Sequence, residues 1–107
     1  MNVVCRKWHH AKEELAMNAK FPLGQLLMTP GAAAAFEGTG ENPFVFLLRH
    51  IQGDWGNIDP EDAQENELSL QKGFRLLSAY TLSDQTKFWI ITEADRSATT
   101  ILLPSEY

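Results

Sequence analysis

The fold is decided by the last third of the chain, where three runs follow one another: FRLLSAYTL (residues 74–82), TKFWIITE (86–93) and ATTILL (98–103). β-Branched and aromatic residues are frequent in these runs, and short polar segments separate them. Such runs predict strands joined by tight turns, so we expect an antiparallel meander. The triplet Trp89-Ile90-Ile91 is apolar at consecutive positions, which places apolar side chains on both faces of the middle strand. Helices on one face and a second copy of the chain on the other would cover them, so a homodimer is expected.

Three helix starts precede the meander, each a capping residue followed by proline: Thr29-Pro30, Asn42-Pro43 and Asp59-Pro60. A Thr, Asn or Asp side chain can accept a hydrogen bond from a backbone N–H of the first turn. Proline is tolerated at the first helical position, because the backbone N–H that it lacks would have no partner within the helix. Glycines after each run predict its end. The expected helices lie around residues 32–36, over 44–52 and from 60 to about 72, and a short strand over 21–29 precedes them. The predicted fold class is α+β, with an antiparallel sheet of three to four strands packed with two to three short helices.

The length of 107 residues suits one domain, which we place over residues 17–107. Residues 1–16 form an N-terminal extension, in which apolar residues at helical spacing predict a short helix over 7–16, and Met17 is an alternative start. No apolar run is long enough to cross a bilayer, and the single cysteine cannot form an intrachain disulfide. Because the sequence lacks the pattern of a secretory signal, a cytoplasmic protein is expected, with no membrane partner.

Acidic residues outnumber basic ones by fourteen to nine, and the net charge of −5 opposes binding to phosphate, so no direct contact with nucleic acid is expected. Residues 54–67 concentrate the acids in a stretch that holds no base. Acids at helical spacing repel one another unless a cation or a basic partner neutralises them, and such a face can imitate a phosphate backbone. The competing interpretation is a solvated face that aids solubility. The candidate binding residues are Asp54, Trp55, Asp59, Glu61, Asp62, Glu65 and Glu67.

A second candidate set combines His50, Glu93 and Arg96 into a small metal-independent hydrolase or nuclease. His50 ends a predicted helix four residues before Asp54, and both the helix C-terminus and the carboxylate would raise the pKa of its imidazole, so His50 could act as general acid. Glu93 or Glu67 would be the base, and Arg96 would stabilise charge on phosphate. The structural alternative is a helix cap after His50 in which Asp54 and the Trp55 indole N–H bond loop backbone, together with a bridge from Arg96 to Glu93 across a hairpin.

A third hypothesis is a small-molecule binding domain whose pocket is lined by Trp55, Trp89 and Tyr80. The sequence has no phosphate-binding glycine loop, no paired-cysteine or HExxH metal motif and no GxSxG, so neither a cofactor nor a metal is expected. The adjacent His9 and His10 diverge on any regular backbone and would need metal ligands from another segment.

Several stretches resemble one family: FPLGQ (residues 21–25), TPG (29–31), GDWG (53–56), ENE (65–67), WIITEADRS (89–97) and TTILLPSEY (99–107). The family consists of small uncharacterised bacterial proteins borne on plasmids, integrative elements and integron gene cassettes. The resemblance covers residues 17–107, and members begin near the equivalent of Met17. It implies a mobile-DNA context and transfers no catalytic residue. The leading hypothesis is therefore an acidic accessory protein of mobile DNA that binds a protein partner, with a host defence nuclease as one candidate.

Overall fold

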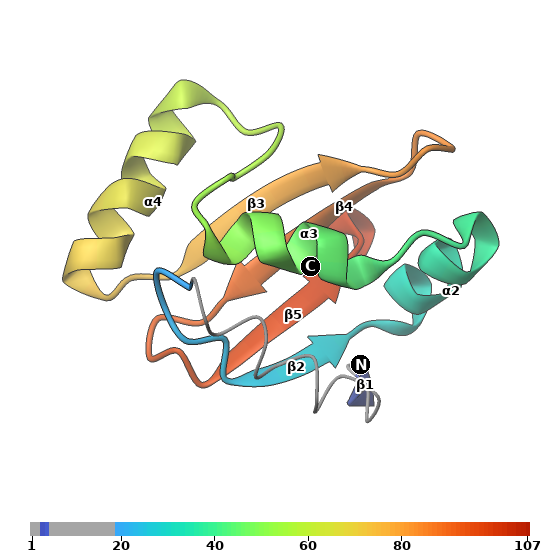
Figure 1. Cartoon of the computed structure of the whole chain (residues 1–107), viewed down its shortest axis with the longest axis horizontal. Coiled ribbons are helices and arrows are strands. Elements are labelled where there is room, and N and C mark those ends of the chain that lie inside the picture. The colour runs from blue at the N-terminus through green and yellow to red at the C-terminus, as the bar shows by residue number, and fades with distance from the viewer. Residues whose placement is uncertain (1–2, 5–18) are drawn as a thin grey trace.

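The computed structural model describes residues 3–4 and 19–107, which form a sheet and helices of the expected α+β class (Figure 1). The strands are β1 (Val3–Val4), β2 (Gln25–Met28), β3 (Leu76–Thr81), β4 (Lys87–Thr92) and β5 (Ala98–Leu102). The helices are α2 (Pro30–Thr39), α3 (Pro43–Ile51) and α4 (Pro60–Lys72), and a 3-10 turn, η1 (Pro104–Glu106), follows β5. The helix predicted over residues 7–16 lies outside the described residues, as do His9 and His10.

The sheet is mixed, with the strand order β1-β2-β5-β4-β3. The meander β3-β4-β5 is antiparallel as predicted, but β2 runs parallel to β5, with Gln25 opposite Ala98 and Met28 opposite Ile101. The prediction of an antiparallel sheet was therefore wrong for this pair. A parallel pair needs a long connection, and the helices α2 to α4 together with β3 and β4 supply it. The relative direction of β2 and β5 is set by how the meander packs beside β2 in the folded protein. No local pattern in residues 25–28 specifies that direction.

The helices begin where the capping signals predict. The Thr29 hydroxyl accepts a hydrogen bond from the first turn of α2 at 3.2 Å, and the Asn42 side chain accepts one from the first turn of α3 at 3.0 Å. Asp59 occupies the corresponding position before α4, but its side chain makes no capping hydrogen bond. At the other ends, Gly40 and Gly73 have φ angles of 73° and 77°, the left-handed conformation with which glycine ends a helix.

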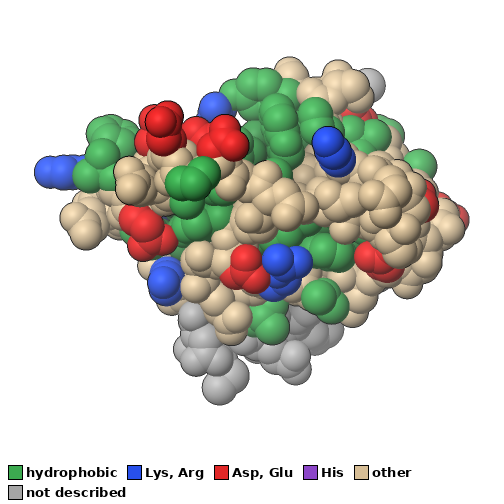
Figure 2. All heavy atoms as spheres, turned by 90° about the horizontal axis from the view of Figure 1, so that it is seen from above, with side chains coloured by type: hydrophobic (Ala, Val, Ile, Leu, Met, Phe, Trp, Pro, Cys, Tyr) green, Lys and Arg blue, Asp and Glu red, His purple; other side chains and the backbone are tan. Residues whose placement is uncertain are grey.

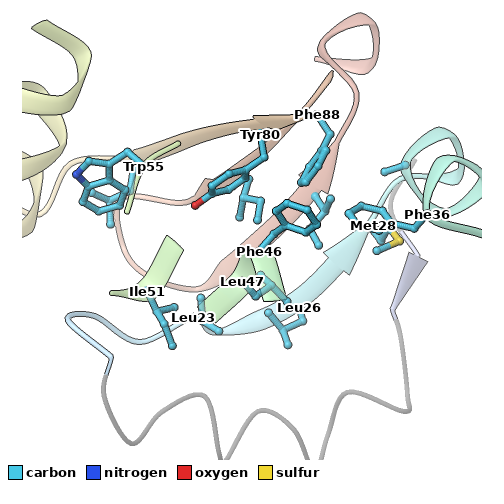
Figure 3. Packing of buried hydrophobic residues seen from close by; sticks show 14 of the residues in the cluster. Leu23, Leu26, Met28, Phe36, Phe46, Leu47, Ile51, Trp55, Tyr80 and Phe88 are labelled. Carbon is cyan, nitrogen blue, oxygen red and sulfur yellow. The ribbon is translucent and has the colours of Figure 1, made fainter. Parts of the chain in front are cut away.

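Helices α2 and α3 pack on one face of the sheet and enclose the hydrophobic core (Figures 1 and 3). The Phe88 ring is central to this core, with its centroid 4.9 Å from those of Phe36 and Phe46 and 5.7 Å from that of Tyr80. Such aromatic pairs add about 0.5–1.5 kcal/mol each beyond the burial of their surface. The aromatic cluster holds α3, and with it His50, against the sheet.

The opposite face of the sheet is also apolar, as the run Trp89-Ile90-Ile91 predicts. Ile90 is fully buried on the helix side, and Ile91, which alternation directs to the other side, is only 4% exposed. The chain end after η1 places the Tyr107 ring 5.7 Å from Trp89. Trp89 is partly buried and Tyr107 is 65% exposed, so the exposed aromatic surface beside β4 belongs mainly to Tyr107.

We propose that a second copy of the chain covers this surface around Trp89 and Tyr107. Analytical ultracentrifugation at micromolar concentration is then expected to give twice the mass of one chain, because a stable pair would bury both aromatic side chains. Replacing Trp89 and Tyr107 by serine should restore the single-chain mass, whereas Val45→Ser with Leu48→Ser on α3 should leave the pair intact. Wild-type protein that sediments as a single chain would contradict the proposal.

Strand β3 is an edge strand, and other segments bind its outward-facing backbone groups. Asn66 of α4, which is buried, donates from Nδ2 to the Leu77 carbonyl at 2.7 Å and accepts from the Leu77 amide at 3.1 Å. Two residues further along, the Ala79 amide donates to the Trp55 carbonyl at 3.1 Å, and the Ala79 carbonyl accepts from the Asn57 amide at 2.6 Å. At these positions the edge cannot pair with a strand of another molecule.

Candidate functional site

The candidate binding residues fall into two groups in the structure, and the first group is engaged in the fold. Within the described residues the one ion pair joins Arg49 Nε to Asp54 at 2.7 Å, and this hydrogen-bonded guanidinium lowers the pKa of the Asp54 carboxyl. The Trp55 indole donates to the Glu67 carboxylate at 2.9 Å, rather than to loop backbone as the helix-cap alternative supposed. These contacts close the loop between α3 and α4, so Asp54, Trp55 and Glu67 have structural partners.

The second group consists of exposed carboxylates that form no ion pair with any residue in 3–4 or 19–107: Asp59, Glu61, Asp62 and Glu65. Asp59 precedes α4, and Glu61 and Asp62 lie in its first turn, where the helix dipole favours negative charge. Glu65 lies one turn further along the helix. Their charge is therefore presented to solvent. Figure 2 shows acidic side chains beside hydrophobic ones at the α4 end of the molecule.

A groove of about 460 Å³ lies between α4 and the start of β3, next to these carboxylates. Asp62 and Glu65 are part of its lining, and so are the apolar side chains of Leu68, Phe74 and Leu77. Leu68 is 49% exposed and Phe74 is 55% exposed. Exposed apolar side chains inside a concave site with charged walls are typical of a binding surface.

Sequence reasoning missed Leu68 and Phe74 as candidate site residues. A signal was present, because Leu68 follows Glu65 by one helical turn and so is an apolar residue on an otherwise acidic face. For Phe74 there was none. Its position after Gly73 suggested the first residue of a buried strand, but β3 begins two residues later at Leu76 and leaves the Phe74 ring outside the core.

Arg96 connects the turn between β4 and β5 to the groove. Its guanidinium donates to the carbonyls of Phe74 at 2.6 Å and Ser69 at 3.0 Å, both of which belong to residues that line the groove. It also donates to the Glu93 carbonyl at 3.1 Å, so it meets Glu93 through backbone and not through the exposed carboxylate expected for a bridge across the hairpin. Arg96 thus holds the last turn of α4 and the segment before β3 together.

His50 lies in the last turn of α3 with no exposed surface, and hydroxyl groups contact both of its ring nitrogens. Nδ1 is 2.5 Å from Ser78 Oγ, and Nε2 is 2.9 Å from Thr92 Oγ1. Thr92 Oγ1 is in turn 2.8 Å from Thr99 Oγ1, which donates to the Leu23 carbonyl at 2.7 Å. A buried chain of hydrogen bonds therefore crosses from β3 through His50 to the segment before β2.

The carbonyl at the end of this chain determines the direction of each bond. A carbonyl only accepts, so Thr99 uses its single hydroxyl proton on Leu23. Thr92 must then donate to Thr99 and accept from Nε2 of His50. The neutral imidazole consequently carries its proton on Nε2 and accepts the hydroxyl proton of Ser78 at Nδ1.

Burial lowers the pKa of His50 from 6.5 to about 3, and the Arg96 guanidinium adds to the effect. The expectation of a raised pKa and an imidazolium at His50 was therefore wrong. His50 does lie at the helix C-terminus, but desolvation of the buried ring outweighs that effect on its pKa. Asp54 is paired with Arg49, and the ring contacts hydroxyl groups instead. Among the described contacts, no side-chain bond joins His50, Glu93 and Arg96 to one another, so the geometry gives the hydrolase hypothesis no support.

The three residues of the hypothetical small-molecule pocket do not share one surface. Trp55 and Tyr80 are buried in the core on the helix-covered side of the sheet. Trp89 alternates with the core residues Phe88 and Ile90, so its side chain lies on the opposite face, against Tyr107. In the part of the chain that the structure describes, no group of three His, Cys, Asp or Glu side chains could hold a metal ion.

Comparison of the chain with protein-family models, with curated proteins and with solved structures finds no match. Among the described helices, none combines the length and the apolar character needed to cross a membrane.

Proposed function

We propose that this protein is an acidic interaction module that binds a positively charged protein partner through α4, and that it serves as an accessory protein of mobile DNA. The observation that supports this proposal is the group of exposed carboxylates without an ion-pair partner in the described residues: Asp59, Glu61, Asp62 and Glu65. A solvated face would display the same charge. The adjacent groove has exposed apolar side chains, and these favour a partner-binding surface over a merely solvated face.

The chemistry of such a partner follows from the charge. Closely spaced carboxylates on a rigid helix present a field similar to that of a nucleic-acid backbone, so a surface that normally binds phosphates would be attracted to them. A nuclease of a host defence system has such a surface and is the candidate partner in a mobile-DNA context. The net charge of −5 also opposes direct binding of nucleic acid, because the phosphates are negatively charged as well.

Replacing the four carboxylates by their amides is expected to reduce capture of a basic partner from host-cell extract by at least about tenfold, because the attraction is electrostatic. Asp59→Asn keeps a residue suited to the helix start, so the fold should survive, and circular dichroism checks this. The same loss should follow when salt is raised, since exposed charges are screened.

A matched control changes four exposed carboxylates elsewhere and alters the net charge equally: Glu37→Gln, Asp84→Asn, Glu93→Gln and Asp95→Asn. Asn can keep the turn hydrogen bonds that Asp84 and Asp95 make to the amides of Thr86 and Ser97. Capture by this control should equal that of the wild type. If both variants lose capture equally, the interaction reflects net charge alone, and the proposal of a specific α4 surface fails.

A further inference from the structure

The groove beside α4 is held in shape by hydrogen bonds before any partner arrives. On one side, the buried Asn66 is fastened to both backbone groups of Leu77. On the other, Arg96 donates to the carbonyls of Ser69 and Phe74. Because these bonds fix the helix, the strand and the segment between them, a ligand entering the groove would not have to order its walls.

The charge of the groove is uneven. Asp62 and Glu65, one helical turn apart, line it without an ion-pair partner among the described residues. Arg75 also lines the groove, and its guanidinium lies 5.2 Å from the centroid of the Tyr107 ring, toward the opposite face of the sheet. An occupant that follows the α4 wall therefore meets negative charge, while one that enters between Leu68 and Phe74 meets apolar surface.

Two kinds of occupant fit poorly. An added β-strand would need free backbone groups on β3, but those of Leu77 and Ala79 are already bound by α4 and the loop before it. A second copy of this chain would bring a further net charge of −5 to an acidic wall. Complementarity favours a cationic protein segment instead.

We infer that the groove takes a segment of a basic protein that presents one large apolar side chain flanked by lysine or arginine. The apolar side chain packs between Leu68 and Phe74, and the flanking cations face Asp62 and Glu65. This inference rests on the proposed function and deepens it. Besides the electrostatic attraction, the partner must present a large apolar side chain that serves as an anchor between Leu68 and Phe74.

The test titrates isotope-labelled full-length protein with three synthetic peptides in an NMR experiment. The first has a phenylalanine between lysines, the second has serine in place of the phenylalanine, and the third has glutamate in place of the lysines. We expect amide shifts at Leu68, Phe74 and Leu77 with the first peptide. Binding should be at least about tenfold weaker with the second, because a buried phenylalanine is lost, and absent with the third.

Variants of the protein make the same distinction. Phe74→Ser should weaken the first peptide at least about tenfold, to the level of the serine peptide. Val45→Ser, which changes an equally exposed apolar residue on α3, should not. The amide spectra of both variants report whether the fold is kept.

The remaining outcomes each overturn the inference. If the two lysine peptides bind alike, charge alone governs the site, which refutes the anchor but leaves the proposed function standing. Equal binding of the lysine and glutamate peptides refutes the cationic part. If no peptide binds, the groove is not a peptide site, and capture by the α4 amide variant then decides separately whether the proposed function survives.

Discussion

Lowering the pH from 7.5 to 5 is expected to reduce the free energy of unfolding by about 2 kcal/mol through His50 alone. The imidazole has a pKa of 6.5 when exposed and of about 3 in the folded protein, where burial disfavours the charged form and the Arg96 guanidinium adds to the effect. Between these values the unfolded chain binds a proton that the folded chain does not. Stability is therefore complete above about pH 6.5 and falls by about 1.4 kcal/mol for each pH unit below it.

Between pH 6.5 and pH 5 the loss of stability caused by His50 can be measured apart from any loss caused by the carboxylates. Folding lowers the pKa of Asp54, Asp84, Asp95 and Glu106 below their ordinary range, so their contributions are lost only when the pH falls further. Urea unfolding at pH 7.5 and pH 5 measures the difference in wild-type protein. His50→Gln removes the proton linkage and should show little change between the two pH values, whatever its stability at pH 7.5.

NMR of the imidazole should in addition show a neutral His50 ring with the proton on Nε2 at pH 5, as the hydrogen-bond chain to the Leu23 carbonyl requires. An unchanged free energy of unfolding between pH 7.5 and pH 5, or a proton on Nδ1, would contradict this account of His50.

Asn66→Ala is expected to lower the free energy of unfolding by about 2–3 kcal/mol, because it removes two hydrogen bonds and leaves the amide and carbonyl of Leu77 without partners. Helix propensity opposes the loss only slightly, since alanine suits a helix better than asparagine. The variant also frees part of the β3 edge, so we expect light scattering to reveal association at concentrations where the wild type shows none.

Gln64→Ala is the matched control for Asn66→Ala. Gln64 is an exposed residue of the same helix, and its replacement should change the free energy of unfolding by less than about 0.5 kcal/mol. Denaturant unfolding measures both variants, and hydrogen exchange at the Leu77 amide should be faster only in Asn66→Ala. Equal stability of the two variants would show that the side chain of Asn66 does not hold α4 to the strand.

Much of the candidate surface could be predicted from the sequence because it depends on neighbours along the chain. The acids of residues 54–67 lie on a helix whose start was visible in Asp59-Pro60. Which of them are available for binding was not visible, because Asp54 and Glu67 are engaged by Arg49 and Trp55. The groove could not be predicted either, because α4 contacts the start of β3 through Asn66. Asn66 is a buried polar residue, and no hydrophobic periodicity in the sequence indicates its burial.

The sequence by itself determined the helix starts at Thr29-Pro30 and Asn42-Pro43 and the meander of the last third, because caps, prolines and strand runs act over a few residues. Only the tertiary structure decided the parallel pairing of β2 with β5 and the neutral state of His50. The pairing depends on where two segments about 70 residues apart meet. The charge of His50 depends on desolvation and on hydroxyl groups from other strands, which come together only when the chain is folded.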